Sequence, residues 1–507
     1  MPSLYSSANS SRIPRRQFLA QWAVSAAAAS LLAACGSTTA TSAPSGTVSS
    51  VTASSAVAIA STPPGSSATL AKATAATASS AASTAVPKAS TAATPAKGAV
   101  VIWHGWGKTG GGLAMTEQAD AFRAANSGVG IEMVDSANVQ KLIAAIAGGT
   151  PPDVMQLVEG QLAPLAVKQA FVPLDANFAR DKIDLNAFWP ISKDVVTFQG
   201  KTYAMPHHQG CYVFLWNKSL FQNAGLNTDQ PPKTWNDVTS LVPKLTKTSG
   251  DQFTQLGFVP IWIQVSWALA SFVADGVPIL ASDGHSVAFD TSAGTNALSW
   301  APQVFAQYQN GYNGWNTWLT AVKSTLPAGP PAQTFYTRGQ LAMAWWGNWM
   351  FDAIQRLSPT LEYGVSGIPV GPDSTAQPLA QSGGGASLSV PTGAKNADGG
   401  WGFLAFVGSP DGQYLTQKDT SDVAALMSAA SDPRILSSKL GRSAVLPLFK
   451  AATSGATLSS PVADTLSTVI ATMQTAVLTN KQSARDALHT AATSMNQTLS
   501  AYYAKNA

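Results

Sequence analysis

The sequence predicts an α/β fold. Between residues 99 and 158, short apolar stretches alternate with helical stretches, which is the order of βαβ units that form a parallel sheet. Hydrophobic residues make up 45% of the 507 residues and charged residues 11%, against about 25% charged in an average soluble domain. The length allows two or three domains of roughly 100–200 residues each. This composition excludes a coiled coil, and two cysteines exclude a small disulfide-rich protein.

The first 34 residues are predicted to be a signal peptide. The pair Arg15-Arg16 precedes an apolar stretch from Phe18 to Ala34, which is short for a bilayer core of about 30 Å. An uncleaved anchor helix is the alternative. The arginine pair resembles the twin-arginine leader of the route that exports folded proteins, and the general secretory route stays open.

Cys35 is the predicted site of lipidation. Leu32-Ala33-Ala34-Cys35 resembles the lipobox of bacterial lipoproteins, whose cysteine is acylated and becomes the first residue. This resemblance implies an extracytoplasmic protein, anchored through the lipid on Cys35 to the outer face of the cytoplasmic membrane. It leaves Cys211 without an intramolecular disulfide partner, so we expect Cys211 to be a small buried hydrophobic residue.

Residues 35–98 are predicted to form a disordered linker. After Cys35 they are almost entirely Ala, Ser, Thr, Pro and Gly, so they bury too little apolar surface to offset the entropy of ordering. Six cations and no acids precede Ala99, so residues 99–507 hold 24 Lys and Arg against 26 Asp and Glu. A folded part with a net charge of −2 attracts a phosphate backbone weakly, and no nucleic-acid partner is expected.

The elements of the folded part follow from hydrophobic periodicity. Strands are predicted at residues 100–103, 130–134 and 153–158, with helices at about 113–125 and 139–147 between them. Near the C-terminus, apolar residues at helical spacing from Val462 to Val477 predict a helix, and a second helix is predicted at residues 484–499.

The turn after the first predicted strand favours a second function class. Gly105-x-Gly107-x-x-Gly110, with Glu132 about 20 residues later, fits the dinucleotide-binding pattern and an exported nucleotide-dependent oxidoreductase. Gly111 and Gly112 weaken this match, because each would cost the following helix about 1 kcal/mol relative to Ala. Trp106 would also crowd the pyrophosphate. Without a nucleotide, the loop still lies where α/β sheets bind ligands.

No catalytic residue, metal or cofactor is predicted. His207 and His208 are adjacent in an extended segment, so their side chains should point to opposite faces and not share one metal ion. The G-x-S-x-G, S-x-x-K and H-E-x-x-H patterns are absent from the sequence. Glycoside hydrolysis needs two opposed carboxylates, and spacing pairs none of the four glutamates of the folded part with an aspartate.

Tryptophan is the most informative residue type. Fourteen of the 15 tryptophans follow residue 98, in clusters that include Trp103/Trp106, Trp262/Trp267, Trp315/Trp318 and Trp345/Trp346/Trp349. We expect eight or nine of them to be core residues. The clusters beside Gly, His and Asn are typical of a site for a ligand with apolar faces and hydroxyl edges, which describes a sugar.

Seven blocks, in one order, identify a family resemblance. They are Ala147–Val154, Gly200–Pro206, Leu215–Phe221, Ala224–Leu226, Pro232–Asp237, Gly339–Met343 with Gly347-Asn348-Trp349, and Gly383–Ala386 with Trp401–Phe406. Together they closely resemble the family-1 extracellular solute-binding proteins of ABC importers, the group that includes maltose-binding protein. The resemblance spans about residues 99–499.

The resemblance implies a two-lobed periplasmic-binding-protein fold, with a mainly parallel sheet flanked by helices in each lobe. Lobe 1 would comprise residues 99–208 and about 386–425, and lobe 2 about 209–385 and 426–507. A sugar or oligosaccharide would be held between the lobes, and the closed form of a monomer would be recognised by the permease subunits of an ABC importer. No bond in the ligand would be broken.

The resemblance also implies the site residues. Many relatives have an aspartate where this chain has Gly210. The positions that match contact positions of the family are His104 and Trp106 after the first strand, Glu159 after the third, His207, His208 and Gln209 on the first crossover, Trp262 and Trp267, Asn348 and Trp349, Gly383 and Gly384, and Arg442. A surface lipoprotein that acts as a sensor or adhesin is a further alternative, and the sequence does not specify which sugar is bound.

Overall fold

The computed structural model describes residues 98–506, apart from residues 109, 136, 263–265, 328–329, 384, 419, 437–445, 448 and 451–459. The predicted signal peptide, the lipidation site Cys35 and the linker through residue 97 therefore lie outside the described residues.

The first of two large sheets has six strands in the order β14-β6-β13-β3-β1-β2. The strands are β1 (Gly98–Trp103), β2 (Val129–Val134), β3 (Val154–Val158), β6 (Ala204–Gln209), β13 (Ala386–Ser389) and β14 (Val423–Ala424). β1 pairs in parallel with β2 and with β3. The helices α2 (Gly110–Ala125) and α3 (Val139–Gly148) connect these strands, so the βαβ prediction for residues 99–158 is confirmed.

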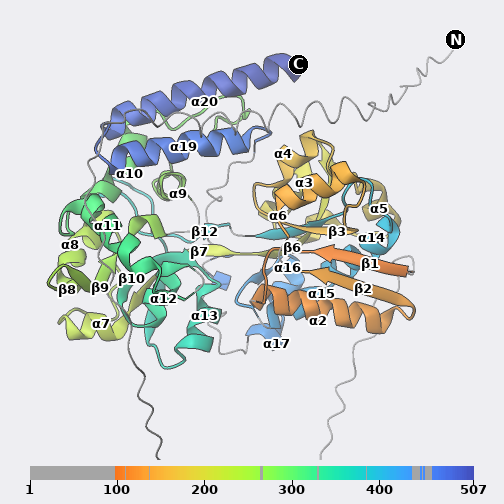
Figure 1. Ribbon diagram of the computed structural model, residues 1–507, viewed down its shortest axis with the longest axis horizontal. Helices are drawn as coiled ribbons and strands as arrows, with labels where there is room; N and C mark the ends of the chain where they lie inside the picture. The colour runs from red at the N-terminus through yellow and green to blue at the C-terminus, as the bar shows by residue number, and fades with distance from the viewer. Residues whose placement is uncertain are drawn as a thin grey trace, which may run out of the picture. The chain divides into compact units, whose positions relative to one another are not determined.

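Helices cover both faces of the first sheet. Figure 1 shows α3 and α4 on one face and α2 and α15 on the other. α2 packs because Met115, Ala119 and Phe122 recur at helical spacing and are buried. The other elements of this lobe are α4 (Leu162–Val167), α5 (Asp175–Arg180), η2 (Leu185–Ala187), α6 (Pro190–Val196), the small hairpin β4 (Thr197–Phe198) and β5 (Lys201–Thr202), α14 (Ala397–Gly408), α15 (Pro410–Lys418), α16 (Met427–Ala430) and α17 (Pro433–Leu436).

The second sheet has the order β11-β7-β10-β9-β8, and β12 also pairs with β7. Its strands are β7 (Cys211–Asn217), β8 (Lys247–Ser249), β9 (Gln252–Phe258), β10 (Leu341–Gly347), β11 (Tyr363–Ser366) and β12 (Gln381–Ser382). The helices around it are α7 (Lys218–Asn223), α8 (Trp235–Leu245), η3 (Pro260–Trp262), α9 (Trp267–Ala274), α10 (Ser292–Phe305), α11 (Gly311–Lys323), α12 (Pro331–Thr337) and α13 (Met350–Leu357). The fold is thus the predicted two-lobed α/β fold.

Two long helices end the chain. α19 (Ala463–Leu478) and α20 (Ala484–Asn506) pack against each other and against α10 of the second lobe (Figure 1). Both predicted C-terminal helices are confirmed. α19 also touches α4 of the first lobe, which brings the first turn of α19 close to that lobe.

The prediction that each sheet is mainly parallel is wrong. β13 pairs antiparallel with β3 and β6, and β14 pairs antiparallel with β6. In the second sheet only β9 and β10 are parallel. β13 runs opposite to β3 and β6 because it follows the segment that returns from the second lobe, so it enters the first sheet from the opposite end instead of through a βαβ connection. β14 lies between α15 and α16 of the first lobe and runs in the direction of β13.

The chain leaves the first sheet at Gly210, between β6 and β7, and returns after β12. Here Gly383 donates a backbone hydrogen bond to the carbonyl of Gly210 at 3.1 Å. A Cβ atom on Gly210 would lie 2.7 Å from the carbonyl oxygen of Gly383, so only glycine allows the two crossing segments to approach this closely.

Most tryptophans are core residues, as predicted. Nine of those after residue 98 are buried, including Trp315, Trp318, Trp345 and Trp346. In the second lobe the rings of Trp235 and Trp300 stack at 4.2 Å between centroids. Clustering in the sequence therefore reflects core packing for these residues. Among the described members of the clusters, Trp103, Trp106 and Trp349 remain partly exposed.

Candidate functional site

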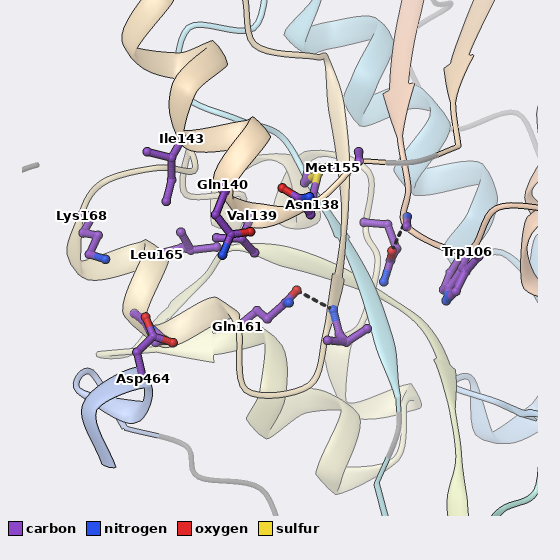
Figure 2. Close-up of a pocket in the computed structure, with 15 residues that line it drawn as sticks. Trp106, Asn138, Val139, Gln140, Ile143, Met155, Gln161, Leu165, Lys168 and Asp464 are labelled. Atoms are coloured by element: carbon purple, nitrogen blue, oxygen red, sulfur yellow. Dashed lines mark hydrogen bonds between the residues drawn. The ribbon is translucent and has the colours of Figure 1, made fainter. Parts of the chain in front are cut away.

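A cavity of about 390 Å³ lies where β1 and β3 end. Its lining residues come from the loop after β1, the start of α3, the end of β3 and helix α4, and one comes from α19. Figure 2 shows Trp106 at one side of the cavity and Lys168 with Asp464 at the other. The site is therefore built mainly by the first lobe, and the first turn of α19 closes it.

Amide side chains position the backbone around the cavity. The Oε1 atom of Gln156 in β3 accepts a hydrogen bond from the backbone N–H of Gly105 at 3.1 Å, which fixes the loop after β1. Gln161 accepts from the N–H of Val158 at 3.0 Å, and this bond is drawn in Figure 2. Asn138 caps α3 by accepting from the N–H of Lys141 at 2.9 Å.

The glycines after β1 serve packing within the loop. A Cβ atom on Gly112 would lie 1.9 Å from the carbonyl oxygen of Gly107, so glycine is required for the loop to fold back on α2. A Cβ atom on Gly111 would lie 3.1 Å from the ring of Trp106. Trp106 thus covers the N-terminus of α2, where a dinucleotide fold would bind pyrophosphate.

Three histidines lie against Trp106. The ring centroids of His104, His207 and His208 lie 6.0, 5.2 and 5.5 Å from that of Trp106. All three histidines are buried, and burial lowers the pKa of His104 below its ordinary value. The site prediction placed these four residues near one another, and the structure brings them together.

The prediction that the side chains of His207 and His208 point to opposite faces is wrong. Their Nδ1 atoms are only 2.7 Å apart, so the side chains meet instead of pointing to opposite faces. The pairing of β6 with β13 shifts register here: Ala386 is opposite His208 and Ser387 opposite Pro206. This irregularity places an extra residue in β6 and breaks the strict alternation. In the described part of the chain, no three side chains are arranged to hold a metal ion.

A second group of predicted residues surrounds the crossing segments. The side chain of Gln209 is fully buried, and neither its Oε1 nor its Nε2 has a hydrogen-bond partner among the described residues. Glu159 and Tyr212 lie nearby: a Cβ atom on Gly383 would be 2.9 Å from the Tyr212 ring and 3.5 Å from the Glu159 carboxylate. Burial raises the pKa of Tyr212, and the charge of Glu159 raises it further.

Asn348 and Trp349 have different environments. Asn348 is fully buried, and its amide is used by the protein: Oδ1 accepts from the N–H of Cys211 at 2.8 Å and Nδ2 donates to the carbonyl of Ser421 at 2.5 Å. Trp349 is partly exposed and packs edge to face on Tyr212, with centroids 5.4 Å apart. Part of the Trp349 indole is therefore accessible, whereas the amide of Asn348 is occupied by hydrogen bonds within the protein.

Of the predicted site residues that the structure describes, Trp106 is the one that lines the cavity. Trp267 is buried in the second lobe and packs against Trp300, at 6.3 Å between centroids. Gly384, Arg442 and the side chain of Trp262 lie outside the described residues. Cys211 is buried and unpaired, and burial raises the pKa of its thiol, which agrees with the predicted role as a small hydrophobic residue.

The sequence analysis missed most of the lining residues of the cavity. Asn138, Gln140, Gln156 and Gln161 follow or lie within predicted elements, and their position at the strand ends was the available signal. Asp464 had no such signal, because it belongs to α19 and is far from α4 (Leu162–Val167) in the sequence. Within the described residues, no helix is both long and apolar enough to cross a membrane.

Comparison with known proteins places this geometry in context. Residues 105–414 match the family described as bacterial extracellular solute-binding protein. A protein of Brucella abortus (strain 2308) whose name describes it as a binding protein is 26% identical over 265 residues, which are 50% of this chain and 59% of that protein. The chain thus spans about three fifths of the length of that relative.

Two further proteins are similar. The sn-glycerol-3-phosphate-binding periplasmic protein UgpB of Pectobacterium atrosepticum is 26% identical over 312 residues, which are 59% of this chain and 67% of UgpB. The structure of CpMnBP1 with mannotriose bound has a TM-score of 0.66 and 23% identity, and the alignment covers 78% of this chain and 99% of CpMnBP1. This likeness shows the fold that the two chains share.

Proposed function

Because this chain belongs to the bacterial extracellular solute-binding protein family, we propose that it binds a sugar or oligosaccharide between its two lobes and delivers it to the permease subunits of an ABC importer. The observation that carries the proposal is the cavity at the strand ends, which combines the ring of Trp106 with the amides of Asn138, Gln140, Gln156 and Gln161. An aromatic face suits the apolar face of a pyranose, and amides suit its hydroxyl groups.

The charges around the cavity favour a neutral ligand. Among the lining residues, Lys168 is the one cation and Asp464 the one anion, and both lie at the side away from Trp106 (Figure 2). A phosphate group is recognised by clustered cations or by a free helix N-terminus. Trp106 covers the start of α2, and the side chain of Asn138 caps the start of α3, so the site favours a sugar over a glycerol phosphate.

Ligand binding would be linked to closure of the lobes. Trp106 and Gln156 belong to the first lobe, Trp349 follows β10 of the second, and Gln209 ends the crossing strand β6. A ligand that contacts both lobes binds the closed arrangement more tightly and shifts the population toward it. The permease subunits then distinguish the loaded protein by this closed form. We further propose a lipid-anchored monomer that breaks no bond in its ligand.

Thermal shift with purified protein tests the proposal. The probes are maltotriose, mannotriose, a panel of other neutral oligosaccharides, and sn-glycerol 3-phosphate. We expect at least one neutral oligosaccharide to raise the melting temperature and change the tryptophan fluorescence, because ligand that binds only the folded state stabilises it by mass action. A response to glycerol phosphate alone, or to no sugar in a broad panel, would contradict the proposal.

A further inference from the structure

A line of buried polar contacts runs beneath Trp106, from Gln118 in α2 through His207 and His208 in β6 to Asp422. All four residues are at most 8% exposed. The contacts are His207 Nε2 to Gln118 Oε1 at 2.9 Å, His207 Nδ1 to His208 Nδ1 at 2.7 Å, and His208 Nε2 to Asp422 Oδ2 at 3.6 Å. The positions of the hydrogen atoms along this line follow from its two ends.

Gln118 fixes the first hydrogen atom. Its Nε2 donates to the carbonyl of Gly412 at 2.8 Å and to Thr416 Oγ1 at 2.6 Å, and a carbonyl oxygen only accepts. The Oε1 atom of Gln118 therefore faces His207, and His207 must donate from Nε2. The orientation of this amide is thus set by its partners and not by assumption.

His207 is neutral, and this determines the next hydrogen atom. Burial lowers the pKa of His207 well below its ordinary value, and the neighbouring histidines lower it further. A neutral imidazole that donates from Nε2 has a lone pair on Nδ1. The Nδ1 atom of His208, 2.7 Å away, must therefore carry a hydrogen atom and donate it.

The far end of His208 meets a carboxylate. If His208 were neutral, its Nε2 lone pair would face the Asp422 oxygen, and two acceptors would repel each other. Asp422 is 8% exposed, and in the described part of the chain His208 is its one ion-pair partner. A buried carboxylate without a counter-charge is strongly unfavourable. A second proton on His208 removes the repulsion between the two acceptors and gives the Asp422 carboxylate a counter-charge.

Trp106 lies on this pair. The centroid of its ring is 5.5 Å from that of His208, within the range of about 6 Å in which a cation attracts an aromatic face. Trp106 is partly exposed and lines the cavity. The backbone N–H of Trp106 also points to His104 Nδ1, at 3.4 Å.

We propose that Asp422 holds His208 as an imidazolium cation and that this cation positions the ring of Trp106 at the edge of the cavity. The positioning of the ring matters for ligand binding if the proposed function is right, whereas the charge state of His208 is independent of it. Asn348 completes the arrangement, because its Nδ2 lies 3.5 Å from Asp422 Oδ1 and its Oδ1 accepts from the N–H of Cys211.

The titratable groups that face His208 are few. They are His104 and His207 beside Trp106, Asp422 before β14, the Cys211 thiol, whose pKa is raised by burial and by Asp422, and Asp352, which reaches the segment through Ser421. The charged side chains of α6, α14 and α15, which pack on or beside β6, are partly or fully exposed. Lys418 of α15 pairs with Glu117 at 2.6 Å.

NMR of the full chain with ¹⁵N-labelled histidine tests the charge state without any ligand. At neutral pH we expect both ring nitrogens of His208 to have the chemical shifts of protonated nitrogens, assigned by loss of signals in His208→Gln. In Asp422→Asn, which keeps the shape of the side chain, the imidazolium fraction of His208 should fall at least about tenfold. The exposed pair His489–Asp290 is the matched control, and Asp290→Asn should leave the His208 signals unchanged.

The indole N–H signal of Trp106 tests the positioning role. It should shift in Asp422→Asn and, in the unaltered protein, should change with pH together with the His208 signals. If His208→Gln fails to fold, Asp422→Asn and the pH series still decide. A His208 that is neutral in the unaltered protein, or a Trp106 signal that does not follow His208, would overturn the proposal. Loss of sugar binding with these signals intact would contradict the proposed function instead.

Discussion

Asn348 accepts a hydrogen bond from the backbone N–H of Cys211 at 2.8 Å, and so ties the end of β10 to the first residue of β7. Its Nδ2 donates to the carbonyl of Ser421, on the segment that leads into β14 of the first sheet. One buried amide therefore joins three segments where the chain passes between the lobes. Asn348, which we predicted as a ligand contact, thus holds together the segments that connect the lobes.

We predict that Asn348→Ala destabilises the protein. Removal of the amide leaves the N–H of Cys211 without its buried partner, which should lower the free energy of unfolding by about 1–3 kcal/mol. Chemical denaturation followed by far-UV circular dichroism measures this change. Asn348→Asp should also destabilise the protein, because its second carboxylate oxygen would meet the carbonyl of Ser421 and lie near the carboxylate of Asp422. Unchanged stability in Asn348→Ala would contradict this account.

Gln209→Leu should stabilise the ligand-free protein and weaken ligand binding. The amide of Gln209 is buried and has no hydrogen-bond partner among the described residues, so an apolar side chain of similar size should raise the free energy of unfolding by about 1–2 kcal/mol. Gln413 is the matched control, because its Nε2 donates to the carbonyl of His207 at 2.8 Å and its Oε1 accepts from the N–H of Leu426. Gln413→Leu should destabilise. If Gln209→Leu and Gln413→Leu lose similar amounts of stability, the expected difference between these two amides is refuted.

Trp349→Ala should weaken oligosaccharide binding without unfolding the protein. The ring is partly exposed and makes a T-shaped contact with Tyr212, so part of the ring remains accessible to a sugar. Loss of stacking should raise the Kd at least about tenfold, which corresponds to about 1.4 kcal/mol. Isothermal titration calorimetry with the sugar found in the thermal-shift panel measures the change. The control is Trp318→Phe, because Trp318 lies on the buried face of α11. If Trp349→Ala is unstable, Trp349 is a core residue and the prediction is wrong.

Gly210→Ala should impair the approach of the crossing segments. The added Cβ atom would lie 2.7 Å from the carbonyl oxygen of Gly383 and 3.1 Å from the ring of Trp349. We expect a loss of about 1–3 kcal/mol in stability, together with weaker ligand binding. Gly130→Ala in β2 is the control, since its Cβ atom would meet nothing closer than 3.7 Å. Equal melting temperatures for the two variants would argue against a steric requirement at Gly210.

Asp275 should make stability depend on pH. Burial raises its pKa to about 6, against about 3.9 for an unfolded chain. Between about pH 4 and pH 6 the folded state therefore binds a proton that the unfolded chain lacks, so the contribution of Asp275 to stability falls as the pH rises. Asp275→Asn should be more stable than the unaltered protein by about 1–2 kcal/mol at pH 7, and this gain should vanish near pH 4.

Urea denaturation at a series of pH values tests the role of Asp275. The Oδ1 atom of Asp275 accepts from the N–H of Gly371 at 2.5 Å, and an asparagine oxygen preserves this bond. Asp283, which is exposed, provides the control variant Asp283→Asn, for which no comparable gain is expected. A gain for Asp275→Asn that is the same at every pH would show that burial of the charge is not its cause.

The order of elements could be predicted from the sequence because it depends on local periodicity. The strand before Trp103, the helix that contains Phe122 and both C-terminal helices follow from the spacing of apolar side chains, which is written in adjacent residues. The family resemblance added the two lobes. It could not supply the antiparallel returns of β13 and β14, because strand direction depends on where a distant segment enters the sheet.

The sequence by itself determined the fold class, the helices and strands at each end of the folded part, and the family. The tertiary structure decided which residues of the right type line the cavity. It placed Trp267 in the core, engaged Asn348 in the hinge, and brought Asp464 to α4 across a large sequence separation. The irregularity in β6 that lets the side chains of His207 and His208 meet likewise depends on the pairing of β6 with β13. Local periodicity specifies which side of an element is apolar, whereas the partner of a buried polar group depends on packing between segments that are distant in the chain.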